Sequence, residues 1–182
     1  MKMFVQRTAI GAGDPFELAA LKAHLRVDDD SDDAAITNMG RTASAELEHF
    51  AQIALLRQTI HVTILGPTME EALRLPVGPG IEGAEPTIAI NGQPFTDFLY
   101  IAFQRPVIVW GDGFAAVMPQ RVDIEYPAGF GDAAASVPHD LAQALMDQTA
   151  LHYDGRSPMD AKSLTTSPHM ARIGAKYRGV QL

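Results

Sequence analysis

The sequence predicts an α+β fold in which a helical bundle carries an inserted antiparallel β module. Two changes in the spacing of apolar residues indicate this class. Residues 14–56 repeat their apolar side chains at the 3.6-residue period of a helix, whereas residues from Arg57 onward alternate at the two-residue period of a strand. Pro138 then opens a second helical pattern, so the predicted bundle consists of two segments separated by the β module.

Two helices joined by an acidic turn are predicted for residues 14–56. Asp14 and Pro15 predict the start of the first helix, because Asp caps unpaired amides and Pro suits the first helical position; Glu17 adds capping-box spacing. The second helix should begin within Asp30–Asp33, whose carboxylates favour the positive end of the helix dipole. Its apolar positions recur at helical spacing and are Ile36, Met39, Ala43, Leu47, Phe50 and Ala54.

The β module is predicted over residues 57–127. Ile60, Val62 and Ile64 alternate with polar residues, which is typical of a half-buried strand. Proline and glycine make residues 75–86 a loop. Short β-prone runs follow at residues 87–90, 98–103, 107–110 and 121–126, separated by turns at 91–92, 105–106 and 111–113.

A third helix is predicted to follow Pro138 and to end at Asp154-Gly155. Its inward positions are Leu141, Ala144, Leu145 and Thr149. The organisation predicted is therefore one domain over residues 1–160, with helical parts at 14–56 and 136–155, followed by an extended tail over residues 161–182.

Charge is distributed unevenly along this chain of 182 residues with a formal net charge of -8. Residues 1–135 hold nine basic and eighteen acidic side chains, whereas residues 161–182 hold four basic side chains and no acidic one. An acidic body argues against a surface that grips phosphate backbones. The basic tail is interpreted either as a solvated terminus or as an arm that docks on an acidic partner.

No cysteine is present, which excludes disulfides and thiolate metal sites and favours synthesis in a reducing cytoplasm. No apolar run approaches the roughly 18 residues that span a bilayer, and the first residues lack the pattern of a signal peptide. We therefore expect a protein that has no membrane segment and is not exported.

The chemical motifs are incomplete. The acidic turn begins like a calcium loop, but Asp33 stands where glycine is needed and Met39 where a bidentate Glu is needed. Ser136, His139 and Asp140 suggest a hydrolase cluster, yet they belong to one helix start with an ordinary capping explanation. The prediction is therefore no enzyme, with no catalytic, cofactor-binding or metal residues.

Two segments that bracket the chain carry a family resemblance. They resemble the start "KaHLRvd…dD..i" and the finish "v.YpAGyg…vP..l..Al…a.hyy..R" of the head-tail connector (adaptor) proteins of long-tailed bacteriophages and gene transfer agents. The matching residues are Lys22, His24, Leu25, Arg26, Val27, Asp33 and Ile36, then Tyr126, Pro127, Ala128, Gly129, Phe130, Gly131, Val137, Pro138, Leu141, Ala144, His152, Tyr153 and Arg156.

The resemblance implies a structural subunit in a virion or phage-like particle, at the head-tail junction. Copies are expected to form a dodecameric ring under the portal protein, to extend the DNA channel without sequence-specific binding, and to give stopper or tail proteins a docking surface. Members of that family reach the portal with their C-terminal segment. The expected portal-binding residues here are Arg172, Lys176, Tyr177, Arg178, Val180 and Leu182.

Two alternatives remain open from the sequence. The chain could be another virion joining protein, such as a stopper or tail-completion subunit. It could also be a small-molecule-binding protein or an enzyme that uses the glycine corner at Gly129–Gly131, because a helix follows that corner.

Overall fold

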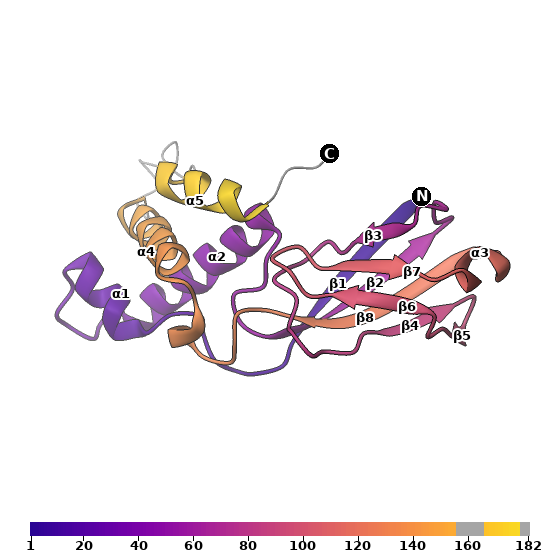
Figure 1. Ribbon diagram of the computed structural model, residues 1–182. Coiled ribbons are helices and arrows are strands. Elements are labelled where there is room, and N and C mark those ends of the chain that lie inside the picture. Colours follow the sequence, from indigo (N-terminus) through magenta and orange to yellow (C-terminus); the bar gives the residue numbers. More distant parts are fainter. Residues whose placement is uncertain (156–165, 179–182) are drawn as a thin grey trace. The chain divides into compact units, whose positions relative to one another are not determined.

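The computed structural model describes residues 1–155 and 166–178, which form two compact units. The β unit comprises Met1–Ala12 and Arg57–Phe130, and the described remainder of the chain forms the helical unit. The predicted α+β class is confirmed, and the chain passes between the units three times (Figure 1). The predicted boundary at residue 160 lies outside the described residues and stays a prediction.

The helical unit is built around its longest described helix, α2 (Asp33–Ala51). Helix α2 buries Ile36, Ala43 and Leu47 completely, as expected from their helical spacing. It packs against three other helices, α1 (Leu18–Leu25), α4 (His139–Asp154) and α5 (Pro168–Arg178), and a short 3-10 turn, η1 (Ala134–Ser136), precedes α4. None of the described helices combines the length and apolar character that crossing a membrane requires.

Helix α5 corrects the extended tail predicted from the sequence. Residues 168–178 are helical and pack against both α2 and α4. Met170 is 1% exposed and Ile173 is 5% exposed, so these residues belong to the core of the helical unit. The prediction of an extended tail failed because Met170, Ile173 and Tyr177, three or four residues apart, lie on one face of a helix.

The predicted start of the first helix is also wrong. Helix α1 begins at Leu18, and the carboxylate of Asp14 does not cap it. Asp14 instead accepts two hydrogen bonds from Arg41, at 2.9 Å from Nε and 3.1 Å from an Nη atom. Both oxygens of the Asp14 carboxylate are thus engaged by the guanidinium, in the bidentate geometry that Arg favours with carboxylates. The second helix begins where the sequence predicted, at Asp33.

Two antiparallel sheets form the β unit. The five-stranded sheet has the order β1-β2-β8-β4-β5, and the three-stranded sheet has the order β3-β7-β6. The strand bounds are β1 Lys2–Ala9, β2 Gln58–Leu65, β3 Ala72–Arg74, β4 Thr87–Ile90, β5 Gln93–Pro94, β6 Phe98–Ile101, β7 Val107–Trp110 and β8 Arg121–Ala128. The sequence predicted β2, β4, β6, β7 and β8, but assigned no strand to residues 2–9.

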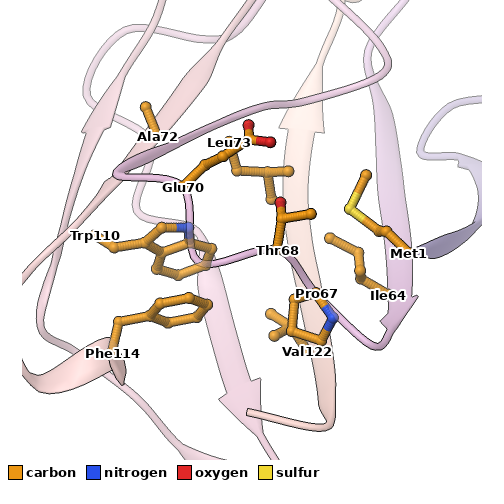
Figure 2. Close-up of a pocket in the computed structure, with 10 residues that line it drawn as sticks. All are labelled: Met1, Ile64, Pro67, Thr68, Glu70, Ala72, Leu73, Trp110, Phe114 and Val122. Carbon is orange, nitrogen blue, oxygen red and sulfur yellow. The ribbon is translucent and has the colours of Figure 1, made fainter. Parts of the chain in front are cut away.

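The inner faces of the two sheets pack on each other. Ile64 and Val122, which are cross-strand partners in the five-stranded sheet, are at most 1% exposed. Opposite them, Trp110 stacks on Phe114, as Figure 2 shows. Their ring centroids lie 4.2 Å apart. The cavity left there is about 10 Å³, the space of one water molecule, so it is too small for a cofactor.

The predicted turn at residues 111–113 does not connect a hairpin. Strand β7 belongs to the three-stranded sheet and β8 to the five-stranded sheet, and the short helix α3 (Gly113–Ala116) lies between them. Asp97 organises this passage, because its carboxylate accepts a hydrogen bond of 2.8 Å from the Gly113 amide and its carbonyl accepts one of 2.9 Å from Gly111. The link therefore carries the chain from one sheet to the other.

Candidate partner-binding site at the C-terminal helix

Helix α5 begins with a cap that the sequence encodes in two adjacent residues. The Ser167 hydroxyl accepts a hydrogen bond of 3.0 Å from the Met170 amide, which is the geometry of an N-cap. Pro168 follows at the first helical position, where its missing N–H costs nothing. This Ser-Pro pair is a helix-start signal in the sequence that the prediction of an extended tail left out.

A buried glutamine fixes the start of α5 to the other helices. Gln148 of α4 is 2% exposed, and its side-chain oxygen accepts a hydrogen bond of 2.7 Å from the Ser167 amide. Its side-chain nitrogen donates to a Glu46 carboxylate oxygen on α2 at 2.8 Å. The same Glu46 oxygen lies 2.9 Å from Nε2 of His152. Because both ends of the Gln148 amide are paired, the helices α2, α4 and α5 share one polar link.

Asp147, in the middle of α4, holds two histidines from different helices. Its Oδ2 lies 2.5 Å from Nδ1 of His169 on α5, and its Oδ1 lies 3.2 Å from Nε2 of His24 on α1. Gln143 donates a further hydrogen bond of 2.8 Å to Oδ1. One carboxylate therefore connects α1, α4 and the N-terminal end of α5.

Asp140, one residue into α4, holds the opposite end of α5. The Tyr177 hydroxyl donates a hydrogen bond of 2.8 Å to Oδ1, and Lys176 Nζ lies 3.2 Å from Oδ2. Burial opposes the charged form, but the bonds from Tyr177 and Lys176 outweigh it and lower the pKa of the Asp140 carboxyl. Burial, reinforced by Asp140, raises the pKa of Tyr177 to about 12.

The apolar contact of α5 depends on a glycine. A Cβ atom at Gly174 would lie 2.5 Å from a Phe50 ring carbon, so only glycine lets α5 approach α2 this closely. Arg178 completes the contact, with its guanidinium carbon 5.9 Å from the centre of the same ring. The basic helix therefore docks on an acidic and aromatic surface of its own chain.

The predicted portal-binding residues occupy different positions around this helix. Lys176 and Tyr177 meet at Asp140, Arg178 covers Phe50, and Arg172 is exposed to solvent. Val180 and Leu182 lie outside the described residues. Sequence reasoning missed the residues that anchor α5, because each contact joins residues of different helices that are far apart in the sequence. The missed residues are Glu46, Asp140, Asp147, Gln148, Ser167, His169, Met170 and Ile173.

The glycine corner is occupied by protein groups. The Gly129 amide donates a hydrogen bond of 3.0 Å to the Pro79 carbonyl, so it is not available to an anionic ligand. A Cβ atom at Gly131 would collide with the Ser136 hydroxyl. The glycines therefore serve close backbone approach, which disfavours the alternative of a ligand site at this corner.

The acidic turn serves the helical unit as an ion-pair site. Lys22 Nζ lies 2.5 Å from an Asp30 carboxylate oxygen and 2.6 Å from one of Asp33, and these two bonds raise the pKa of Lys22. Asp29 accepts hydrogen bonds from the amide and the hydroxyl of Ser31. Within residues 1–155 and 166–178, no three His, Asp or Glu side chains form a group suited to a metal ion.

Comparison with known proteins identifies solved structures that share this fold. No family model and no curated protein matches the chain. Chains of solved structures do match. A chain from the neck of an empty gene transfer agent particle, computed with C6 symmetry, has a TM-score of 0.75 and 22% identity over 98% of this chain and 97% of its own.

Two further structures agree. A chain from the virion of a native gene transfer agent has a TM-score of 0.75 and 24% identity, covering 98% of this chain and 96% of its own. One from the neck of a native particle, computed with C12 symmetry, has a TM-score of 0.74 and 21% identity, covering 98% and 97%. The fold is that of these particle proteins. The family resemblance of the sequence is confirmed at the level of the fold.

Proposed function

We propose that this chain is a structural subunit of the neck of a phage-like particle, and specifically the head-tail connector that forms a ring under the portal. The observation that carries the proposal is the likeness to three gene transfer agent chains over nearly their whole length. The C6 and C12 symmetries of two of those neck structures support a ring of identical copies here. A dodecamer is the copy number that the C12 neck favours.

The proposed role is assembly and not catalysis. The ring extends the DNA channel from the portal and presents a surface to stopper or tail proteins. The net charge of -8 suits a conduit, because an acidic wall lets DNA slide without binding it. This role places the protein at the head-tail junction after its synthesis in the bacterial cytoplasm.

The portal contact is proposed for the C-terminal residues, some of which position α5 while others contact the portal. Lys176, Tyr177 and Arg178 hold α5 on the helical unit, so they position the segment that follows. Arg172, which is exposed on α5, and the terminal residues Val180 and Leu182 would contact the portal directly. The positive charge of α5 suits an acidic portal surface.

Truncation after Arg178 tests this proposal without removing α5 from the core. The full chain and the truncated chain are each mixed with the portal protein whose gene lies beside the gene of this chain. The masses of the complexes are then measured. We expect ring complexes with the full chain and at least a tenfold loss of affinity after truncation, the scale of one interface hot spot. Circular dichroism and urea unfolding control for folding.

The outcomes separate the parts of the proposal. Undiminished attachment of the truncated chain would remove residues 179–182 from the portal contact, and Arg172→Glu would then test the exposed face of α5. A full chain that never binds the portal, but joins a ring of tail proteins, would favour the stopper alternative. A chain that stays monomeric with every neck component would overturn the structural role.

A further inference from the structure

Asn91 and Gly92 form the tip of the hairpin between β4 and β5. Ile90 pairs with Gln93 across this two-residue turn, and both turn residues have positive φ, 52° for Asn91 and 81° for Gly92. Asn-Gly is the dipeptide that such a turn favours, because both of its central positions lie in the left-handed region. Both residues are exposed to solvent.

The Asn91 side chain fastens this tip to the loop that follows α3. Its Oδ1 atom accepts hydrogen bonds from the Gln120 and Arg121 amides, at 2.9 and 3.1 Å. Its Nδ2 atom donates to the Val117 and Met118 carbonyls, at 3.4 and 3.3 Å. We call these four bonds the Asn91 clamp. The clamp needs a carboxamide, because it uses an acceptor oxygen and both N–H donors of one group.

The loop held by the clamp has little else to fix it. Met118 has a φ of 46°, a region that a residue with a Cβ atom enters only at a cost. Met118 is 75% exposed and Val117 is 42% exposed, so apolar packing contributes little here. Residues 117–120 are therefore held by hydrogen bonds, and the clamp supplies a large share of them.

Asn-Gly is also the dipeptide in which an asparagine side chain reacts most readily with its own backbone. The Gly92 nitrogen attacks Cγ of Asn91 and forms a C–N bond, while the side-chain NH2 takes up the amide proton and leaves as ammonia. Water then opens the cyclic imide at either carbonyl and gives aspartate or isoaspartate. Glycine favours the attack because it has no side chain beside the nitrogen and restricts the backbone least.

Water is the only co-reactant, and it reaches the tip. An open hollow beside Asn91 is lined by Gly92, Gln120, Arg121 and Asp123. The clamp nevertheless opposes the reaction in the folded chain. Attack requires Cγ of Asn91 to approach the Gly92 nitrogen, whereas the clamp holds the carboxamide on residues 117–121. The reaction therefore depends on opening of the loop, a local event that does not require global unfolding.

The product of the reaction cannot restore the clamp. A carboxylate accepts hydrogen bonds but has no N–H to donate. One of its oxygens would therefore face the Val117 and Met118 carbonyl oxygens, which now lie 3.4 and 3.3 Å from Nδ2, with no proton between them. Because two acceptors repel each other, the loop stays loosened after the reaction.

We infer that Asn91 is a deamidation site controlled by the clamp: its conversion to aspartate or isoaspartate is slow while the clamp is closed, and the conversion then prevents the clamp from re-forming. A single opening of residues 117–120 can thus become a permanent covalent change at the exposed Met118 loop. This site lies in the β unit and does not depend on the proposed ring.

Peptide mapping by mass spectrometry measures the reaction, because deamidation replaces NH2 with OH. The full chain is incubated at neutral pH, either folded or unfolded in guanidinium chloride. We expect Asn91 to convert about tenfold or more slowly in the folded chain, as for a loop that is open in about a tenth of the molecules or fewer. Asn38 of α2, which is followed by Met39, is the internal control and should remain unmodified in both states.

Two outcomes of this measurement would overturn the inference. Equal rates in the folded and the unfolded chain would mean that the clamp does not control the reaction. Absence of conversion in both states would mean that Asn91 is not a modification site. Ring formation with the portal is measured separately, so neither outcome bears on the proposed function.

A variant that imitates the product tests the second half of the inference. In Asn91→Asp, the Met118 and Gln120 amides should exchange their hydrogens about tenfold faster than in the unmodified chain, because the loop has lost the clamp. Asn38→Asp makes the same chemical change in α2 and should leave these amides unaffected. Unchanged exchange in Asn91→Asp, or equal acceleration in both variants, would show that the carboxamide of Asn91 does not hold the loop.

Discussion

The Tyr177 hydroxyl donates a hydrogen bond of 2.8 Å to the Asp140 carboxylate, and this bond joins the last turn of α5 to the first turn of α4. At the other end of α5, His169 meets Asp147. The two contacts run in opposite order along the helices, so α4 and α5 pack antiparallel. Docking of α5 is therefore fixed at both of its ends.

Tyr177→Phe should loosen the C-terminal end of α5. We expect the free energy of unfolding to fall by about 1 kcal/mol, since a bond to a partly exposed carboxylate contributes less than a buried one. Amide hydrogen exchange should accelerate in residues 168–178. Tyr153→Phe removes another tyrosine–aspartate bond, to Asp32, and serves as control: it should not accelerate exchange in α5 selectively.

The docking of α5 should depend on pH at both extremes. The folded pKa of Asp140 is lowered from 3.8, so its stabilisation is present above pH 3.8 and is lost as pH falls through the lower folded pKa. The folded pKa of Tyr177 is raised from 10.0 to about 12, so its stabilisation is present below pH 10.0 and is lost as pH rises through about 12.

Ultraviolet difference titration measures the alkaline limb. The spectrum of Tyr177→Phe, subtracted from that of the unmodified chain, isolates one of the four tyrosines. Asp140→Asn should lower the isolated pKa toward 10.0, because the negative charge beside the phenol is gone. An unchanged value in Asp140→Asn would mean that the carboxylate does not act on Tyr177.

Gly174→Ala should destabilise the helical unit even though alanine is the better helix former. The propensity gain is about 1 kcal/mol, but a Cβ atom 2.5 Å from the Phe50 ring must displace it, which costs about 1–3 kcal/mol. Urea unfolding measures the balance. In a Phe50→Leu background the collision is relieved, so the same substitution should become neutral or stabilising; an equal loss in both backgrounds would exclude the collision as the cause.

Tyr126→Phe should weaken the β unit. The buried Tyr126 hydroxyl donates to the Val77 carbonyl at 3.0 Å and accepts from the Val77 amide at 3.1 Å. Its loss leaves two buried backbone groups without this partner, so we expect a loss of about 2–3 kcal/mol in urea unfolding. Exchange of the Val77 amide should accelerate far more than that of Leu75, which donates to the Pro106 carbonyl. Parallel acceleration would indicate general destabilisation.

The sequence predicted correctly those helices and strands whose bounds depend on residues close to them in the sequence. Strands β4 and β7 begin and end where predicted, because each is a short apolar run between turn residues. Strand β1 was missed because its register depends on β2, more than fifty residues away in the pairing of Val5 with Val62. The cap expected at Asp14 failed for a similar reason, since Arg41 competes from another helix.

The candidate site was predictable only in part. The charge of the C-terminal segment was interpreted as a solvated terminus or as an arm for an acidic partner, whereas the structure pairs His169 with Asp147 and Lys176 with Asp140 of the same chain. The periodicity of Met170, Ile173 and Tyr177 was readable, yet too short to count as a helix without its cap at Ser167. The position of α5 depends on its contacts with α2 and α4, which the sequence alone does not reveal.

The alternation of the chain between its two units has a consequence for synthesis on the ribosome. The β unit has all its strands once Phe130 has emerged, whereas α2 has only α1 to pack against until α4 and α5 follow. A chain interrupted before Pro138 would therefore expose the apolar face of α2, which aggregates or attracts proteases. The order of elements along the chain therefore ties burial of the apolar face of α2 to completion of the last two helices.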